Sequence, residues 1–144
     1  MADSTSGAIT VAESPDVVMA TIADLAAYPE WVSAVTSVEV LETGADGRIR
    51  TARFVMDAGM VKDTYVLAYD WAADGMSVRW ELVEGQLQKS QHGSYSLARR
   101  DGGTEVVYQL AVDLHIPMIG LLKRKAEKVI INTALGELKK RVEA

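Results

Sequence analysis

The chain has 144 residues, of which 49% are hydrophobic and 24% are charged, and its formal net charge is −5. This length suits one domain, and this composition is typical of a folded globular protein and not of a disordered one. The sequence contains no cysteine, which excludes disulfides, thiolate nucleophiles and cysteine-ligated metal centres. Its two histidines, His92 and His115, are too few for a site with several histidine ligands. We therefore expect one domain over residues 1–144, with residues 1–6 as a disordered tail, and neither cofactor nor metal.

Charge is distributed unevenly along the chain. Residues 1–116 carry 8 basic and 17 acidic side chains, whereas residues 117–144 carry 7 basic and 3 acidic ones. The basic segment is either the solvated face of a long helix or a surface that meets an anionic partner. The acidic remainder is unsuited to a phosphate backbone, so we expect no nucleic-acid partner. The N-terminus has no secretory-signal pattern and no run of about 18 apolar residues occurs, which predicts a cytoplasmic protein without an integral membrane segment.

The first predicted elements are a strand and two short helices. Residues 8–12 form a short apolar strand pattern. Ser14 is a favourable N-cap and Pro15 suits the first helical position, and apolar residues follow at helical spacing. The segment 28–31, which reads Tyr-Pro-Glu-Trp, interrupts this helix and predicts a second short helix through Val35.

From residue 37 onward the hydrophobic period changes from 3.6 to 2, which is typical of β-strands. Glycine and aspartate clusters at 44–47, 73–75 and 100–103 separate the alternating segments and predict turns. The chain up to residue 114 therefore predicts an antiparallel meander. One face of it carries most of the large side chains, namely Phe54, Met56, Tyr65, Leu67, Tyr69, Trp80, Leu82, Tyr95, Tyr108, Leu110 and Val112.

A long helix is predicted after Ile116 and Pro117, which end the last strand. Its first half shows one apolar stripe, made of Met118, Ile119, Leu122, Ala126, Val129, Ile130 and Thr133. Its second half shows another stripe, made of Ala134, Leu135, Leu138 and Val142. At 100° per residue the two stripes lie roughly 100–150° apart. We therefore expect a kink near residues 132–136 or a second surface against the helix, such as the partner subunit of a homodimer.

The sheet face with the large side chains must be covered, and the last helix is the only long helix that can cover it. Ala126 and Thr133 are small where this helix is expected to face inward. Small helix residues opposite a curved, tyrosine-rich sheet leave room for a cavity with apolar walls and a few hydroxyl groups, as in small-molecule sites. A filled core is the alternative interpretation.

Three segments resemble the START-like helix-grip superfamily, also called SRPBCC. They are the Tyr-Pro-Glu-Trp segment at 28–31, the hairpin segments 93–97 and 102–106, and the Ile-Pro pair at 116–117 before the final helix. The resemblance runs from about residue 7 to residue 142. It implies an α+β helix-grip fold, in which a curved antiparallel sheet wraps around a long C-terminal helix and two short helices follow the first strand. The chain is most similar to bacterial polyketide cyclase/dehydrase-like and coenzyme Q-binding-like proteins, which implies a pocket but no particular chemistry.

We expect the ligand cavity to be lined by Trp31, Phe54, Met56, Tyr65, Leu67, Tyr69, Trp80, Leu82, Tyr95, Tyr108, Leu110, Leu122 and Ala126. The tyrosine hydroxyls either hold a ligand carbonyl or an enolate, or bond the backbone or water as core groups. His92 has the opposite parity to Tyr95 and is expected to face outward. No arginine is expected to face inward, which departs from the family's cyclases and argues against cyclisation.

The leading hypothesis is therefore a protein that binds a small hydrophobic ligand, such as a lipid, quinone or polyketide, for transport or sequestration. Two alternatives stay open. One is a polyketide aromatase/cyclase or dehydratase, for which the sequence assigns no catalytic residue. The other is an interaction module that uses the basic C-terminal helix.

Overall fold

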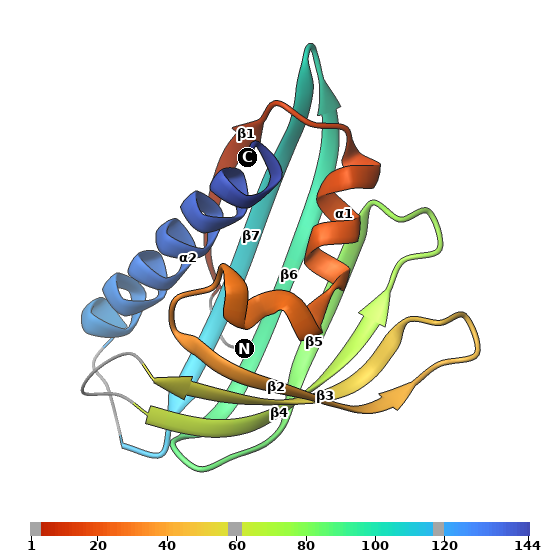
Figure 1. The fold of residues 1–144 in the computed structure, drawn as a ribbon. Helices are drawn as coiled ribbons and strands as arrows, with labels where there is room; N and C mark the ends of the chain where they lie inside the picture. Colours follow the sequence, from red (N-terminus) through yellow and green to blue (C-terminus); the bar gives the residue numbers. More distant parts are fainter. Residues whose placement is uncertain (1–3, 58–61, 117–119) are drawn as a thin grey trace.

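The computed structural model describes residues 4–57, 62–116 and 120–144. Within them lies a seven-stranded antiparallel sheet that curls around three helices (Figure 1). In chain order the elements are β1 (Thr5–Val11), α1 (Pro15–Ala23), the 3-10 helix η1 (Leu25–Glu30), β2 (Val35–Thr43), β3 (Ile49–Asp57), β4 (Lys62–Trp71), β5 (Ser77–Gly85), β6 (Gln88–Arg100), β7 (Gly103–Leu114) and α2 (Gly120–Val142). This arrangement confirms the predicted helix-grip α+β fold.

The strand order is β1-β7-β6-β5-β4-β3-β2, so the first strand pairs with the last and the other neighbours are consecutive along the chain. Figure 1 shows α2 beside β1 and β7, while α1 and η1 cover the middle of the curled sheet. The hydrophobic core therefore lies between the sheet on one side and the three helices on the other.

Local sequence explains several of these boundaries. The Ser14 hydroxyl accepts a hydrogen bond from the Val17 amide, and Pro15 occupies the first turn of α1. Gly47 and Gly102 have φ angles of 81° and 78° at the tips of two hairpins, where a residue with a side chain would be strained. The predicted turns thus form at the predicted glycines.

The strand alternation is also confirmed. Directly opposed pairs such as Phe54 with Tyr65 and Tyr95 with Tyr108 lie on the inner face, and their side chains belong to the hydrophobic core. The intervening residues, Arg79 among them, lie on the outer face. A period of 2 fixes the face of each residue as long as register shifts stay few, which explains the agreement.

Two boundaries near the N-terminus need correction. Strand β1 begins at Thr5, which is paired with Leu110, so Thr5 and Ser6 are ordered by the sheet and do not belong to a tail. Residues 1–3 of the expected tail lie outside the described residues. The second short helix ends at Glu30, because Val35 already begins β2 and pairs with Met56.

The predicted packing of the long helix was wrong in its first half. The buried residues of α2 are Glu127, Ile131, Leu135, Leu138 and Val142, which form one stripe from Glu127 to the end of the helix. A single stripe needs no kink.

The expected first stripe lies on the outside of α2. Leu122 is 54% exposed, Val129 60% and Ile130 45%, and Ala126 and Thr133 are exposed as well. Met118 and Ile119, the other members of that stripe, lie outside the described residues. The pattern misled because a charged residue, Glu127, takes a buried position and aliphatic residues take exposed ones. None of the described helices combines the length and the apolar character that a membrane span requires.

Candidate functional site

A run of aromatic rings begins at η1 and continues onto the inner face of β3 and β4. Trp31 and Tyr28 lie 5.0 Å apart between ring centroids in an edge-on arrangement. Tyr28 lies 6.4 Å from Phe54, which stacks on Tyr65 at 5.4 Å. These contacts join the end of the short helices to the sheet. The stacking of Phe54 on Tyr65 follows from the direct pairing of these two residues across β3 and β4.

A second run crosses β4, β5, β6 and β7. Tyr69 stacks on Trp71 at 5.4 Å between ring centroids and lies 5.9 Å from Trp80. Trp80 in turn lies 5.5 Å from Tyr95, and Tyr95 lies 4.7 Å from Tyr108. The inner face is therefore walled by aromatic rings from the short helices to the last strand.

Burial raises the pKa of every tyrosine in these two runs. For Tyr69 and Tyr108 the pKa lies well above the ordinary value of 10.0. The main cause is that burial disfavours the phenolate, and the second is repulsion between this phenolate and those of neighbouring tyrosines. The pKa values of Tyr28, Tyr65 and Tyr95 are raised mainly by burial too. All five hydroxyls are consequently protonated at neutral pH and act as hydrogen-bond donors, not as bases.

The hydroxyls differ in what they bond. The Tyr28 hydroxyl donates to the Ile22 carbonyl oxygen at 2.6 Å. Among the described residues, the hydroxyls of the other four tyrosines have no hydrogen-bond partner. We call these four the inner tyrosines: Tyr65, Tyr69, Tyr95 and Tyr108.

The unbonded hydroxyls of the inner tyrosines do not break the rule that polar atoms closed off from solvent form hydrogen bonds. In the described part of the chain, no side-chain oxygen or nitrogen that is closed off from solvent lacks a partner. Since the inner tyrosines make no hydrogen bond, their hydroxyl oxygens keep some accessible surface. Four protonated donors on the inner sheet face, on rings that are buried or half-buried, therefore remain without a partner among the described residues.

A chain of side-chain hydrogen bonds holds Trp80, the residue at the centre of the second aromatic run. The Trp80 indole nitrogen donates to Gln91 Oε1 at 2.8 Å, and Gln91 Nε2 donates to Gln88 Oε1 at 2.5 Å. Gln88 Nε2 donates to Asp63 Oδ2 at 3.2 Å. The Asp63 carboxylate also accepts from three backbone amides, those of residues 86, 87 and 88. Trp80 is thus anchored to the β5–β6 turn, and Asp63 is fully occupied by that structural task.

Helix α2 closes the site from the other side. The Glu137 carboxylate accepts from the Ser33 backbone amide at 3.2 Å, and Arg141 forms an ion pair with Glu30 at 3.0 Å. The charge of Glu137 also contributes to the raised pKa of Tyr95, after burial and Tyr28. These contacts hold the η1–β2 segment against α2 next to the aromatic run.

Buried Glu127 fixes the N-terminal half of α2 to the sheet. Its carboxylate accepts from the Thr5 hydroxyl, the Val112 amide and the Lys123 ammonium, each at 2.7 Å. Strand β1 pairs with β7 only as far as Leu110, so Glu127 bonds a β7 amide two residues beyond the end of β1. This helix position is polar because it completes a sheet edge.

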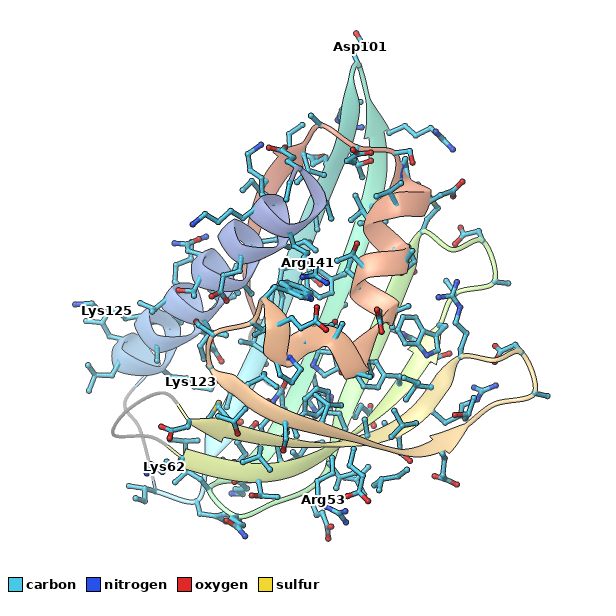
Figure 2. All side chains as sticks on the ribbon, in the orientation of Figure 1. Arg53, Lys62, Asp101, Lys123, Lys125 and Arg141 are labelled. Carbon is cyan, nitrogen blue, oxygen red and sulfur yellow. The ribbon has the colours of Figure 1, made fainter. Side chains whose placement is uncertain are left out.

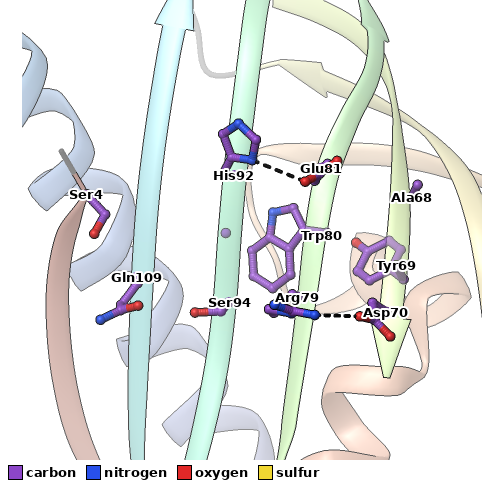
Figure 3. A pocket seen from close by; sticks show the side chains of 11 residues that line it. Ser4, Ala68, Tyr69, Asp70, Arg79, Trp80, Glu81, His92, Ser94 and Gln109 are labelled. Carbon is purple, nitrogen blue, oxygen red and sulfur yellow. Dashed lines mark hydrogen bonds and ion pairs between the residues drawn. The ribbon is translucent and has the colours of Figure 1, made fainter. Parts of the chain in front are cut away.

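The outer face of the sheet carries a shallow groove of about 580 Å³ (Figure 3). His92 lies on the outer face, as predicted. It lines this groove and lies 3.7 Å from Glu81. Arg79 lies 2.7 Å from Asp70 on the same face. These side chains belong to the surface opposite the inner tyrosines, and the charges of Arg79 and Asp70 match each other. Exposed His115 donates its backbone amide to the Leu87 carbonyl and lies at the end of β7.

The residues expected to line a cavity fall into three groups. Those buried on the inner sheet face are Phe54, Leu67, Tyr69, Trp80, Tyr95, Tyr108 and Leu110. Those half-buried around them are Trp31, Met56, Tyr65 and Leu82. Leu122 and Ala126 are exposed on α2 and point away from the sheet, so the expectation that they face inward was wrong.

Several residues of this region escaped the sequence analysis. Buried Asp63, Gln88 and Glu127 carry no apolar signal, and their burial depends on partners that are distant in sequence. Gln91 shares the parity of Tyr95, so alternation places it inward, but nothing in the sequence points to its bond with Trp80. Polar residues at inward positions are the only sequence signal that could have indicated this network.

The chain matches the family model for polyketide cyclase / dehydrase and lipid transport over residues 3–143. A comparison with curated proteins gives no match. Among solved structures, a START superfamily protein from Mycobacterium smegmatis shares 21% identity, with a TM-score of 0.91 and coverage of 97% of each chain. A protein from Thermus thermophilus shares 23% identity, with a TM-score of 0.82 and coverage of 98% of this chain and 97% of the other.

An aromatase/cyclase from Streptomyces shares 19% identity, with a TM-score of 0.77 and coverage of 100% of this chain and 98% of the other. At identities of 19–23% the solved structures establish the fold but not the chemistry, which has to be argued from the residues of this chain. The family and the fold both fit a protein that holds a hydrophobic molecule inside the curled sheet. Because the family model spans nearly the whole chain, the protein belongs to the polyketide cyclase / dehydrase and lipid transport family.

Proposed function

We propose that this chain binds a small hydrophobic ligand between the inner sheet face, η1 and α2, and that the inner tyrosines orient it. The observation that supports the proposal is that four protonated hydroxyls have no partner among the described residues while their rings lie among apolar side chains. Binding sites for small molecules combine apolar walls with a few polar groups of this kind. The ligand would serve as the partner that the four hydroxyls lack within the protein.

The chemistry of the walls indicates which ligand class fits. Aromatic rings on four strands favour a flat, unsaturated molecule that can stack, and hydroxyl donors favour ligand oxygens that accept hydrogen bonds. Quinones and aromatic polyketides have both properties, whereas a saturated acyl chain lacks the acceptors. Burial contributes roughly 25 cal/mol per Å² of apolar ligand surface, less the cost of ordering the ligand.

Binding is better supported than catalysis by the same residues. A cyclisation that begins by removing a proton needs a base near the ligand, and the raised pKa values leave the inner tyrosines protonated. Asp63 is occupied by backbone amides, and His92 lies on the outer face. We therefore propose retention or transfer of the ligand without chemical change.

The proposal is tested by titrating the protein with menadione, a naphthoquinone, and following the fluorescence of its three tryptophans, of which Trp80 lies at the centre of the second aromatic run. Wild type is expected to show saturable quenching. Tyr69→Phe and Tyr108→Phe, which each remove a hydroxyl and keep the ring, are expected to weaken binding about fivefold, as loss of one hydrogen bond worth ~1 kcal/mol requires.

Tyr28→Phe is the matched control, because the Tyr28 hydroxyl already bonds the protein. Its affinity for menadione is expected to equal that of wild type. Affinities that are equal across all three variants would remove the inner tyrosines from ligand recognition, and the absence of saturable binding would count against a quinone-like ligand.

A further inference from the structure

The exposed side of α2 changes character along the helix. In its first half it carries four large aliphatic residues, and we call them the aliphatic patch: Leu121 (72% exposed), Leu122 (54%), Val129 (60%) and Ile130 (45%). In its second half the exposed positions are polar or small, Asn132 and Lys140 among them. Exposed aliphatic residues clustered on one half of one helix form an interaction surface more often than a random part of the protein surface does.

Basic side chains lie along the same half of α2 as the aliphatic patch. Helix α2 carries 7 basic and 2 acidic residues, although the whole chain has a net charge of −5. In the described part of the chain, Arg124, Lys125 and Lys128 form no ion pair, and Lys128 only donates to the Ser6 carbonyl. Figure 2 shows Lys125 projecting away from the sheet and Lys123 near the start of the helix.

A small hollow of about 230 Å³ lies at the end of β7, close to the start of α2. Its lining includes the basic groups of Lys89, His115 and Lys123, one carboxylate, that of Asp113, and the aliphatic residue Ile116. Asp113 accepts from the Ser90 hydroxyl, and Ile116 is 66% exposed. The hollow therefore sets the Lys89 ammonium, and the Lys123 ammonium that pairs with Glu127, next to exposed aliphatic surface, an arrangement that suits an anionic group attached to an apolar chain.

We propose that the first half of α2 docks on an anionic lipid bilayer, with the aliphatic patch inserted at the level of the headgroups and the basic side chains of the same half bound to phosphates. Aliphatic residues flanked by lysine and arginine are the pattern of helices that lie in a membrane interface. Lysine and arginine side chains can place their stems along the apolar layer and their charges among the headgroups. The acidic remainder of the chain would orient the protein with α2 toward the bilayer.

Charge also argues against a second copy of the chain as the occupant. A symmetric dimer would set the patch of one protomer against the same patch of the other. The cations Arg124, Lys125 and Lys128 of one protomer would then lie near those of the other, and buried Glu127 leaves no acidic side chain exposed beside them on the described helix. An anionic surface removes this repulsion.

The docking proposal goes beyond ligand binding and can fail separately from it. Its test is sedimentation of the protein with vesicles of phosphatidylcholine alone and of phosphatidylcholine mixed with phosphatidylglycerol. Binding is expected only to the mixed vesicles and is expected to weaken as salt is raised. Lys125→Gln is expected to lower the vesicle affinity about fivefold, which corresponds to ~1 kcal/mol for one cation at a membrane surface.

Matched variants test whether the position of a substitution, inside or outside the aliphatic patch, decides its effect on vesicle affinity. Val129→Asp places a carboxylate in the aliphatic patch and is expected to lower vesicle affinity about tenfold or more. Val83→Asp makes the same change at an equally exposed valine on β5, where both side chains are 60% exposed in the wild type, and is expected to have no effect. Lys140→Gln is the control for Lys125→Gln and is expected to have no effect, since Lys140 lies roughly 22 Å further along the helix.

Three results would overturn the docking proposal. They are equal binding to neutral and anionic vesicles, equal effects of Val129→Asp and Val83→Asp, and a dimer that forms through Val129 without any vesicle binding. Tyr108→Phe is expected to bind vesicles as wild type does, so a failure of ligand binding and a failure of docking are read from different variants.

Discussion

The indole of Trp80 packs directly on the backbone of Gly93, its partner across β5 and β6 on the inner face of the sheet. A Cβ atom at Gly93 would overlap three atoms of the indole ring. The absence of a side chain at Gly93 therefore allows Trp80 to lie flat at the centre of the second aromatic run and to reach Gln91.

Gly93→Ala is expected to displace the indole and break its bond to Gln91. Overpacking of this kind costs about 1–3 kcal/mol, and chemical denaturation followed by tryptophan fluorescence measures it. Gly136→Ala is the control, because nothing lies near Gly136 in α2. That variant is expected to stabilise the protein by ~0.5–1 kcal/mol through helix propensity. Equal stability changes in both variants would contradict the described packing of Trp80.

The tyrosine hydroxyls are expected to contribute unequally to stability. Tyr28→Phe removes a hydrogen bond to the Ile22 carbonyl and is expected to lower the free energy of unfolding by ~1 kcal/mol. Tyr69→Phe removes a hydroxyl that bonds no described residue and is expected to change it by less than ~0.5 kcal/mol. Denaturant titration of both variants without ligand makes the comparison. A large loss in Tyr69→Phe would mean that its hydroxyl has a protein partner.

Alkaline pH is expected to destabilise the fold. Every tyrosine of the chain has a raised pKa in the folded protein, chiefly because of burial, while the unfolded chain ionises near pH 10. The folded state therefore binds more protons there, so the stabilisation is complete below pH 10 and is lost as the pH rises above it.

The measurement is ultraviolet absorbance of tyrosinate recorded together with circular dichroism. Tyrosinate is expected to form together with unfolding. Ionisation of tyrosines near pH 10 in a protein that keeps its secondary structure would show that the rings are less buried than described.

Glu127 is expected to be one of the most sensitive positions outside the aromatic core. Glu127→Ala leaves the Lys123 ammonium and the Val112 amide without their acceptor, and such a loss costs about 3–5 kcal/mol. Glu84→Ala, a substitution at an exposed glutamate on β5, is expected to change stability by less than ~0.5 kcal/mol. Thermal unfolding of the two variants checks this, and similar midpoints would contradict the anchoring role of Glu127.

The sequence was sufficient for the sheet and its faces. Strand alternation is a local signal, so Tyr69 and Tyr108 could be placed inward, and His92 outward, without knowledge of their neighbours. The turn glycines ended the strands where the structure ends them. Family resemblance supplied the arrangement of helices, which local patterns do not determine.

The packing of α2 could not be predicted in the same way. A helix is placed by what its side chains meet, and Glu127 meets the free edge of β7 only after β1 has paired with it. The exposed aliphatic residues of α2 gave the stronger hydrophobic pattern and were therefore assigned to the wrong side. Asp63 escaped for a related reason, since its acceptors are filled by amides 23 to 25 residues away.

The observed orientation of α2 determines what a substitution at Ala126 does to the site. Ala126 was expected to face the sheet but is exposed on α2. A bulky residue at this position does not enter the region between helix and sheet, so Ala126→Trp is expected to leave ligand binding unchanged. Thermal unfolding is expected to be unaffected as well. Loss of menadione binding in Ala126→Trp would place the ligand on the outer side of α2.

The most direct test of the central claim is native mass spectrometry of the protein as purified from cells, followed by extraction of bound molecules under denaturing conditions. Ligand binding by the inner tyrosines predicts a fraction of protein with additional mass, an unsaturated, oxygen-bearing molecule in the extract, and less of it from Tyr69→Phe and Tyr108→Phe than from Tyr28→Phe. A protein that carries no additional mass and also fails to bind menadione would contradict the claim.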